Sequence, residues 1–304
     1  MRKKIYLIIG LSMIGIILLS ACVPQKTSGA ATKKIVIVSI LPQQYFVERI
    51  AGDLFEIKVM VDPGQSAENY EPTPEKMKMV SNSLAYFTIG FPFEKNWMDK
   101  FTAGNPELKI YDTIAGFELL PMPQHHHEGE EVHEEEGDEV HEGELDPHVW
   151  LSPRAVKVQA QNIAAGLSEL DPENAAIYQA NLNSFLADID QLDQEIQAEL
   201  APVQNRIFMI FHPAMGYFAH DYELEQISIE IEGTEPSAQE MAALIDEAQE
   251  EGIKVIFVQK EFSTRSAETI AKEIDGSVVP VDILSADWLN NMREMAKSLA
   301  ETMQ

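Results

Sequence analysis

The sequence contains a single cysteine, Cys22, among its 304 residues. One thiol excludes an internal disulfide, and it excludes the cysteine-rich ligand sets that hold structural zinc. Basic residues are also scarce, with 22 lysines and arginines against 50 aspartates and glutamates and a formal charge of −28. Because nucleic acids and anionic lipid surfaces need a basic face, we exclude both as broad partners. The acidic excess favours a cationic partner, although acidity alone more often serves solubility.

The N-terminal apolar run, residues 5–19, is too short to cross a membrane, because a spanning helix needs about twenty apolar residues. Basic residues precede the run and small residues follow it, which is typical of a secretory signal peptide. The ending Leu19-Ser20-Ala21-Cys22 resembles the bacterial lipobox, whose cysteine is lipidated. We therefore expect a lipoprotein signal peptide at 1–22, a flexible tether at 23–32 and an extracytoplasmic protein anchored to the cell membrane through Cys22. The alternative is an ordinary signal peptide with a chance cysteine.

Two groups of short apolar segments predict β-strands, because each is rich in Ile, Val and Phe and is bounded by polar or turn residues. The segments are 34–40, 57–61, 84–89 and 108–111, then 206–211, 226–231, 254–259 and 277–281. Helical patterns alternate with them, which indicates parallel sheets covered by helices. The expected fold is α/β, with two lobes that each contain a mostly parallel four-stranded sheet flanked by helices.

One long, rigid helix is predicted between the lobes, over residues 171–200. Its apolar stripe, at spacings of three and four, consists of Tyr178, Leu182, Phe185, Ile189, Leu192 and Ile196. Asp171 and Pro172 suit the start of a helix. The resulting boundaries are an N-terminal lobe at 33–170, the linking helix at 171–200 and a C-terminal lobe at 201–304.

Residues 124–145 form an acidic insert in the N-terminal lobe with almost no apolar content, so we expect this insert to be mobile. It holds five of the eight histidines: His125, His126, His127, His133 and His141. These histidines are interpreted either as an auxiliary metal-binding loop or as part of a solvated spacer. Flexible imidazoles lose chain entropy when they chelate, so any affinity here should be lower than that of a preformed site.

Four side chains outside the insert are candidates for a metal site. His212 and Asp282 each follow a predicted strand, Glu68 lies in the loop after the second strand, and His148 precedes a predicted helix. Ligands of α/β sheets bind at the carboxyl ends of strands, so the four can converge between facing lobes. Imidazoles and carboxylates suit zinc, manganese or iron. Taken singly, none of the four is convincing, because each is also compatible with a structural role. We favour a structural role for a further histidine, His220, which lies eight residues after His212.

Several motifs together carry a resemblance to a known family. They are Glu68-Asn69-Tyr70-Glu71-Pro72-Thr73-Pro74, Asp146-Pro147-His148-Val149-Trp150-Leu151, Asp171-Pro172-Glu173-Asn174 with Tyr178 and Asn181, and Phe211-His212-Pro213-Ala214. From Lys33 to near its C-terminus the sequence resembles the ZnuA and TroA-like solute-binding proteins, the metal receptors of bacterial zinc and manganese ABC importers. The resemblance implies two α/β lobes joined by one rigid helix, with the metal between them, and delivery of that metal to a membrane permease.

The resemblance also implies ligand roles. The family's second histidine ligand falls on His148, its third ligand on His212 and its C-terminal aspartate on Asp282. At the first position relatives usually have histidine, whereas this sequence has Glu68. Two imidazoles and two carboxylates form a harder set than three imidazoles, which weakens the case for zinc over manganese. The histidine-rich insert resembles that of the zinc-specific branch, so we expect Zn²⁺, with a manganese or iron receptor of the same fold as the alternative.

No enzymatic activity is expected. A cell-surface zinc metallohydrolase is the competing class, and it would need an open coordination position and a general base. Four protein ligands would fill the coordination sphere, and the sequence contains neither His-Glu-x-x-His nor Gly-x-Ser-x-Gly. An added role in cell adhesion is compatible with the resemblance. We therefore expect a monomeric receptor that binds a divalent metal, docks on a permease and does not bind nucleic acid.

Overall fold

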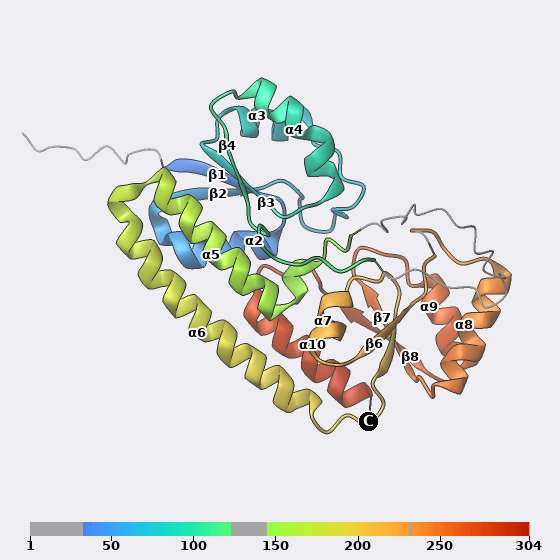
Figure 1. The fold of residues 1–304 in the computed structure, drawn as a ribbon. Coiled ribbons are helices and arrows are strands. Elements are labelled where there is room, and N and C mark those ends of the chain that lie inside the picture. Colours follow the sequence, from blue (N-terminus) through green and yellow to red (C-terminus); the bar gives the residue numbers. More distant parts are fainter. Residues whose placement is uncertain (1–32, 123–144, 232, 304) are drawn as a thin grey trace, which may run out of the picture. The chain divides into compact units, whose positions relative to one another are not determined.

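The N-terminal sheet contains four parallel strands in the order β2-β1-β3-β4 (Figure 1). The strands are β1 (Lys34–Val38), β2 (Phe55–Val59), β3 (Ala85–Thr88) and β4 (Lys109–Asp112). The central strand β3 is completely buried, and so are the last three residues of β1. Continuous apolar runs of this kind are expected when helices cover both faces of a parallel sheet.

The C-terminal sheet repeats this topology, with the parallel order β6-β5-β7-β8. Its strands are β5 (Ile207–Ile210), β6 (Glu225–Ser228), β7 (Val255–Gln259) and β8 (Ser277–Val281). In this sheet β6 is added on one side of β5 and β7 on the other, so the strand order reverses between β5 and β7. The same reversal occurs between β1 and β3. Residues that follow these central strands lie at the switch point where α/β sheets bind ligands.

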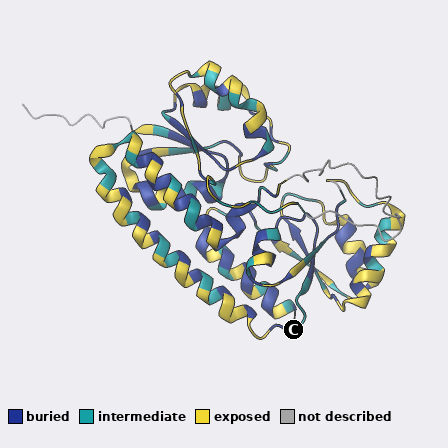
Figure 2. Ribbon diagram, in the orientation of Figure 1, coloured by how far each residue is buried: buried dark blue, intermediate teal, exposed yellow. Residues whose placement is uncertain are grey.

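The helices flank the two sheets, and their outer faces are exposed while their inner faces are buried (Figure 2). They are α2 (Leu41–Ala51), α3 (Pro74–Ser81), α4 (Pro92–Gly104), α5 (Pro153–Leu170), α7 (Gly216–Asp221), α8 (Ala238–Glu250), α9 (Arg265–Glu273) and α10 (Trp288–Thr302). Local sequence sets several helix starts. The side chains of Thr73, Ser152 and Ser237 accept the cap hydrogen bonds of α3, α5 and α8, and prolines open α3, α4 and α5.

The linking helix is present as α6 (Ala175–Leu200), preceded by the 3-10 turn η3 (Pro172–Asn174). Every residue of the predicted apolar stripe is buried. The helix packs against α2, α5 and α10, so the C-terminal helix returns to the long helix (Figure 1). Trp288 of α10 meets Phe46 of α2 edge to face, with ring centroids 5.1 Å apart. The aromatic contact therefore joins the last helix of the chain to the first lobe.

The computed structural model describes residues 33–122, 145–231 and 233–303. Its contacts divide the chain into Met1–Lys33 and Lys34–Gln304, and the second of these units contains both sheets. The predicted signal peptide with Cys22, the tether and the five insert histidines lie outside the described residues. None of the helices in the described ranges combines the length and apolar character that a membrane-spanning helix needs. The α/β prediction, with two four-stranded parallel sheets and one long helix between them, is confirmed.

Candidate metal centre

His148 is fixed by the segment that connects the N-terminal sheet to α5. It caps the short turn η2 (Val149–Leu151) and is buried. The backbone N–H of Asp146 donates to the carbonyl of Leu120 (2.8 Å), and the hydroxyl of Tyr217 donates to the carbonyl of Asp146 (2.8 Å). The backbone two residues before His148 is thus held by Leu120 on one side and by Tyr217 on the other.

His212 lies two residues after the end of β5 and is also buried. Gln259, at the end of the neighbouring strand β7, donates from Nε2 to the His212 carbonyl (2.6 Å) and accepts from the His212 N–H (3.3 Å). The ring of Phe262 stacks on the imidazole, with centroids 5.1 Å apart and planes 17° apart. The end of β7 therefore holds the backbone of His212, and the segment after it packs against the imidazole ring.

Glu68 reaches the same place from the loop between β2 and α3. Tyr70 anchors this loop, because its hydroxyl donates to the carbonyl of Met60 (2.6 Å). The Glu68 side chain is 29% exposed, whereas the two histidine side chains are 2% and 3% exposed. Glu68 therefore lies on the solvent side of the pair of histidines.

The three side chains form the one group of potential metal ligands found among the described residues. The Nε2 atoms of His148 and His212 lie 3.2 Å apart. Glu68 Oε1 lies 3.5 Å from Nε2 of His148 and 2.5 Å from Nε2 of His212. Two ligands bound to a tetrahedral zinc ion at about 2.0 Å are separated by about 3.3 Å. The first two separations already suit such an ion, and the third is a hydrogen bond that would lengthen.

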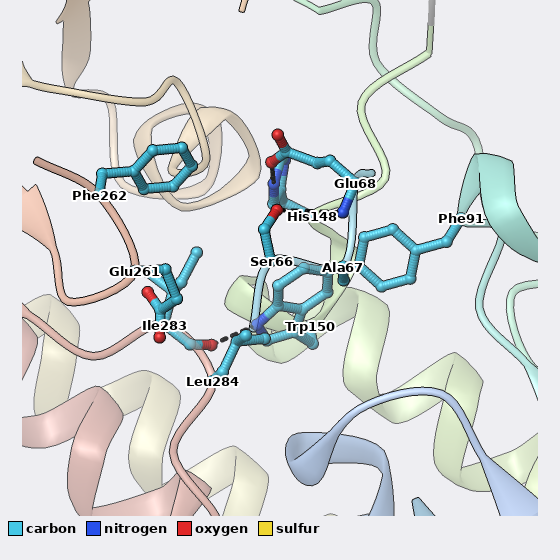
Figure 3. Close-up of a pocket in the computed structure, with 10 residues that line it drawn as sticks. All are labelled: Ser66, Ala67, Glu68, Phe91, His148, Trp150, Glu261, Phe262, Ile283 and Leu284. Carbon is cyan, nitrogen blue, oxygen red and sulfur yellow. Dashed lines mark hydrogen bonds and ion pairs between the residues drawn. The ribbon is translucent and has the colours of Figure 1, made fainter. Parts of the chain in front are cut away.

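A small pocket adjoins this group (Figure 3). Its volume is about 20 Å³, which is room for about one water molecule. Glu68 and His148 line one side, and Glu261 and Ile283 line the other (Figure 3). Trp150 connects the two sides, because its Nε1 donates to the carbonyl of Ile283 (2.6 Å). The pocket has room for a small ion or a water molecule.

Each imidazole has a carboxylate behind it. Asp146 Oδ1 lies 2.7 Å from Nδ1 of His148, and Glu230 Oε1 lies 2.5 Å from Nδ1 of His212. A carboxylate at Nδ1 holds the N–H there and turns Nε2 toward a metal, an arrangement common around metal-binding histidines. Neither carboxylate is among the residues predicted from the sequence. Asp146 could have been found from its place two residues before His148, whereas Glu230 follows a different strand and carries no comparable signal.

Gly216, which opens α7, is needed beside Asp146. A Cβ atom at this position would lie 2.6 Å from Oδ2 of Asp146, well inside van der Waals contact. The Oδ2 atom is buried and has no hydrogen-bond partner among the described residues. A side chain at residue 216 would therefore push the carboxylate that orients His148.

Each of the three side chains shifts the pKa of its neighbours in the group. Burial favours the neutral form of His212, but its hydrogen bonds to Glu230 and Glu68 outweigh burial and raise its pKa to about 9. Burial is likewise outweighed at His148, where Asp146 and Glu68 raise the pKa above its usual value. At Glu68, burial opposes ionisation, yet hydrogen bonds from the two histidines lower its pKa to about 2. A bound cation would therefore compete with protons on the two imidazoles.

Asp282, the fourth predicted ligand, is not in this group. It directly follows β8, and its Oδ2 lies 2.8 Å from Nζ of Lys260 in an ion pair. His220, for which we favour a structural role, is exposed on α7 near Asp221. The structure thus brings together Glu68, His148 and His212 of the predicted set and leaves Asp282 beside a lysine.

Comparison with known proteins places this geometry in context. The sequence profile described as "ZnuA: Zinc-uptake complex component A periplasmic" matches residues 36–302. The zinc-binding protein AdcA of Streptococcus pyogenes serotype M3 is 29% identical over 282 residues, which are 90% of this chain and 54% of that protein. The chain therefore spans about half the length of this relative.

Two solved structures are more similar in sequence. A crystal structure of ZnuA is 42% identical with a TM-score of 0.82, covering 90% of this chain and 100% of that one. A ZnuA deletion mutant with zinc bound is also 42% identical, with a TM-score of 0.81, covering 90% of this chain and 98% of that one. The resemblance inferred from the motifs is confirmed: this chain belongs to the ZnuA family of periplasmic zinc-uptake components.

Proposed function

We propose that the protein is an extracytoplasmic receptor that captures one Zn²⁺ ion with Glu68, His148 and His212 and delivers it to an ABC importer. The observation that carries the proposal is the convergence of the two Nε2 atoms and one carboxylate oxygen, with a second carboxylate behind each ring. Both rings are oriented before any ion arrives. Little conformational entropy is then lost on binding, which supports high affinity.

Zinc is favoured over manganese by the donor atoms. The group offers two imidazole nitrogens and one carboxylate oxygen, a set that suits four-coordinate zinc. Manganese prefers more oxygen ligands in an octahedral arrangement, so it is the alternative cargo. The zinc-bound structure of a 42% identical ZnuA mutant supports the same choice.

Transport fits the pocket better than hydrolysis does. A metallohydrolase must admit a substrate beside its metal-bound water. The cavity of about 20 Å³ next to Glu68 and His148 has room for a single water molecule. We therefore propose that the ion is the cargo and that no organic molecule is converted here. Anchoring through Cys22, docking on a permease and a monomeric state belong to the same proposal.

Zinc binding by matched histidine variants tests the function. The wild-type protein, stripped of metal, is titrated with Zn²⁺ against a chelator of known affinity, and bound metal is counted by elemental analysis. We expect one tight zinc per chain and a loss of affinity by orders of magnitude in His148→Ala and in His212→Ala. The exposed His220 provides the control, and His220→Ala should bind like wild type. Equal affinity in all four proteins would refute the proposal.

A further inference from the structure

The hydroxyl of Tyr217, on α7, lies between the backbone groups of Leu120 and Asp146. These two residues face each other beside the antiparallel bridge of Pro121 and Leu145, and residues in such a position ordinarily exchange two hydrogen bonds. The Asp146 N–H does donate directly to the Leu120 carbonyl (2.8 Å). The Leu120 N–H instead donates to the Tyr217 hydroxyl (3.0 Å), which donates to the Asp146 carbonyl (2.8 Å). The tyrosine therefore replaces the second hydrogen bond of the pair.

Tyr217 is buried together with the backbone that it holds. Asp146 is also buried, and the ring of Phe117 packs on the Tyr217 ring with centroids 5.7 Å apart. A buried carbonyl that is left without a donor is costly, because water does not reach it. The position of the Asp146 backbone therefore depends on a side chain from the C-terminal half of the chain.

Asp146 passes this constraint to His148. Its Oδ1 accepts a hydrogen bond from the His148 N–H (2.8 Å) and lies 2.7 Å from Nδ1 of the His148 ring. The carboxylate thus holds the histidine both at its backbone and at its imidazole. A displacement of the Asp146 backbone would move the carboxylate and, with it, the Nε2 atom on the other side of the ring.

Tyr217 is also fixed relative to His212, which precedes it on the same stretch of chain. The turn between them is held by Gln226 of β6, whose Oε1 accepts from the Met215 N–H (3.0 Å) and whose Nε2 donates to the Pro213 carbonyl (3.2 Å). The start of α7 therefore has a set position beside the His212 backbone. Through α7, the Tyr217 hydroxyl joins the segment of one histidine to the segment of the other.

We propose that Tyr217 is a positioning residue that holds His148 at the correct distance from His212 and thereby sets how tightly and how long the ion is bound. The inference rests on the proposed function and adds a residue outside the three ligands and the two carboxylates behind them. The two Nε2 atoms lie 3.2 Å apart, and ligands of tetrahedral zinc are separated by about 3.3 Å. A small displacement of His148 is therefore enough to weaken binding to both rings at once.

Loss of the hydroxyl should affect the zinc-bound protein more than the metal-free protein. Without an ion, the Asp146 segment can shift until water or another group satisfies its carbonyl. With an ion bound, both rings must stay in place, so the missing hydrogen bond is not replaced. Its cost then appears as weaker zinc binding and faster zinc release.

Two tyrosine-to-phenylalanine variants test the inference. Tyr217→Phe removes the hydroxyl and keeps the ring. Tyr222→Phe is the matched control, because Tyr222 ends the same helix, is also buried, and donates from its hydroxyl to Asp193 of α6 (2.9 Å). Zinc affinity, the rate of zinc transfer to a chelator and the free energy of unfolding without metal are measured for both variants and wild type. Tyr217→Phe should bind zinc about three- to tenfold more weakly, the range expected from one buried hydrogen bond, whereas Tyr222→Phe should bind zinc like wild type.

A double-mutant cycle shows whether Tyr217 acts through Asp146. Asp146→Ala removes the carboxylate that contacts His148, so Tyr217→Phe should cause no further loss of zinc affinity in this background. In the Glu230→Gln background, where the carboxylate behind His212 is altered instead, the loss should persist. A residue that only stabilised the fold would show the same effect in both backgrounds.

Three results would overturn the inference. They are wild-type zinc affinity in Tyr217→Phe, an equal loss of affinity in Tyr222→Phe, and a loss from Tyr217→Phe that is unchanged in the Asp146→Ala background. A wild-type protein without a tight zinc site would instead overturn the proposed function.

Discussion

The Nε2 atoms of His148 and His212 lie 3.2 Å apart although the residues are separated by 64 positions in the chain. Two imidazole nitrogens this close need a proton or a cation between or beside them, because their lone pairs otherwise repel. Glu68 adds a negative charge on the open side. The centre is therefore built to hold positive charge, and the predictions below concern what supplies it.

Removing the carboxylates behind the rings should weaken zinc binding without removing a ligand. Asp146→Asn and Glu230→Gln keep the volume but change the partner at Nδ1 of His148 and His212. We expect each variant to lose about 10- to 100-fold in zinc affinity, as is typical of such partners. Chelator competition provides the measurement. Wild-type affinity in both variants would show that the rings do not depend on these carboxylates.

Zinc affinity should rise as the pH rises toward about 9. The pKa of His212 is raised to about 9 by Glu230 and Glu68 against the effect of burial, so zinc must displace a proton below that pH. One displaced proton corresponds to about a tenfold change in affinity per pH unit. Calorimetry in buffers of different ionisation enthalpy measures the released protons. Binding that releases no proton at pH 7 would contradict this charge assignment.

The same pKa gives the opposite trend for folding of the metal-free protein. Because the folded pKa of His212 lies above the usual value, its ion pairs stabilise the fold fully below about pH 6.5. That contribution is lost as the pH rises through about 9. The free energy of unfolding of the metal-free protein is measured at several pH values. Between about pH 6.5 and about pH 9 it should fall less in His212→Gln than in wild type.

Replacing Glu68 by histidine should increase selectivity for zinc. Glu68→His converts a two-imidazole, one-carboxylate group into three imidazoles, and imidazole favours zinc over manganese. We expect the ratio of zinc to manganese affinity to rise by roughly an order of magnitude. Glu71 is exposed in the same loop, so Glu71→His is the control and should leave the ratio unchanged. An unchanged ratio in Glu68→His would argue against Glu68 as a ligand.

Deleting residues 124–144 should leave the tight site intact. The ends of the deleted segment already meet, because Pro121 and Leu145 form an antiparallel bridge and the Asp146 N–H donates to the Leu120 carbonyl. A short glycine linker can therefore join them without moving His148. Titration of the deletion variant should show one zinc bound with nearly wild-type affinity. Loss of tight binding would place the site among the insert histidines.

Buried Glu94 gives a prediction about stability that is independent of metal. Burial raises its pKa to about 7 despite hydrogen bonds from Ser39 and from the N–H groups of Ile89 and Gly90. An acid with a raised folded pKa stabilises the fold below its usual pKa of about 4.5, and that stability is lost as the pH rises through about 7. Between pH 5 and pH 8, Glu94→Gln should lose less stability than wild type, by up to about 3 kcal/mol. If the free energy of unfolding falls by the same amount in both proteins between pH 5 and pH 8, this prediction is wrong.

Most of the fold could be predicted because the strands of parallel sheets are buried on both faces and appear as short apolar runs. The predicted segments 34–40 and 277–281 correspond closely to β1 and β8. The segment 226–231 extends beyond β6, which ends at Ser228, because the apolar alternation continues past the last paired residue. The strand end matters for the site, since Glu230 beyond it turns toward His212.

The candidate site could be predicted only in part. His148 and His212 could be found because histidine is rare outside the insert and both lie at element ends. The pairing of Asp282 with Lys260 depends on the register between β7 and β8, which sequence spacing does not contain. The role of Glu230 likewise depends on which strand lies beside β5. Contacts set by strand order and register therefore require the structure.

Direct location of the ion tests the central claim most sharply. Crystals of the full chain loaded with one equivalent of Zn²⁺ would be measured on both sides of the zinc absorption edge. The anomalous difference map should show one strong peak about 2.0–2.2 Å from Nε2 of His148, Nε2 of His212 and a carboxylate oxygen of Glu68. A dominant zinc peak at any other place, with these three side chains still hydrogen-bonded to one another, would contradict the account.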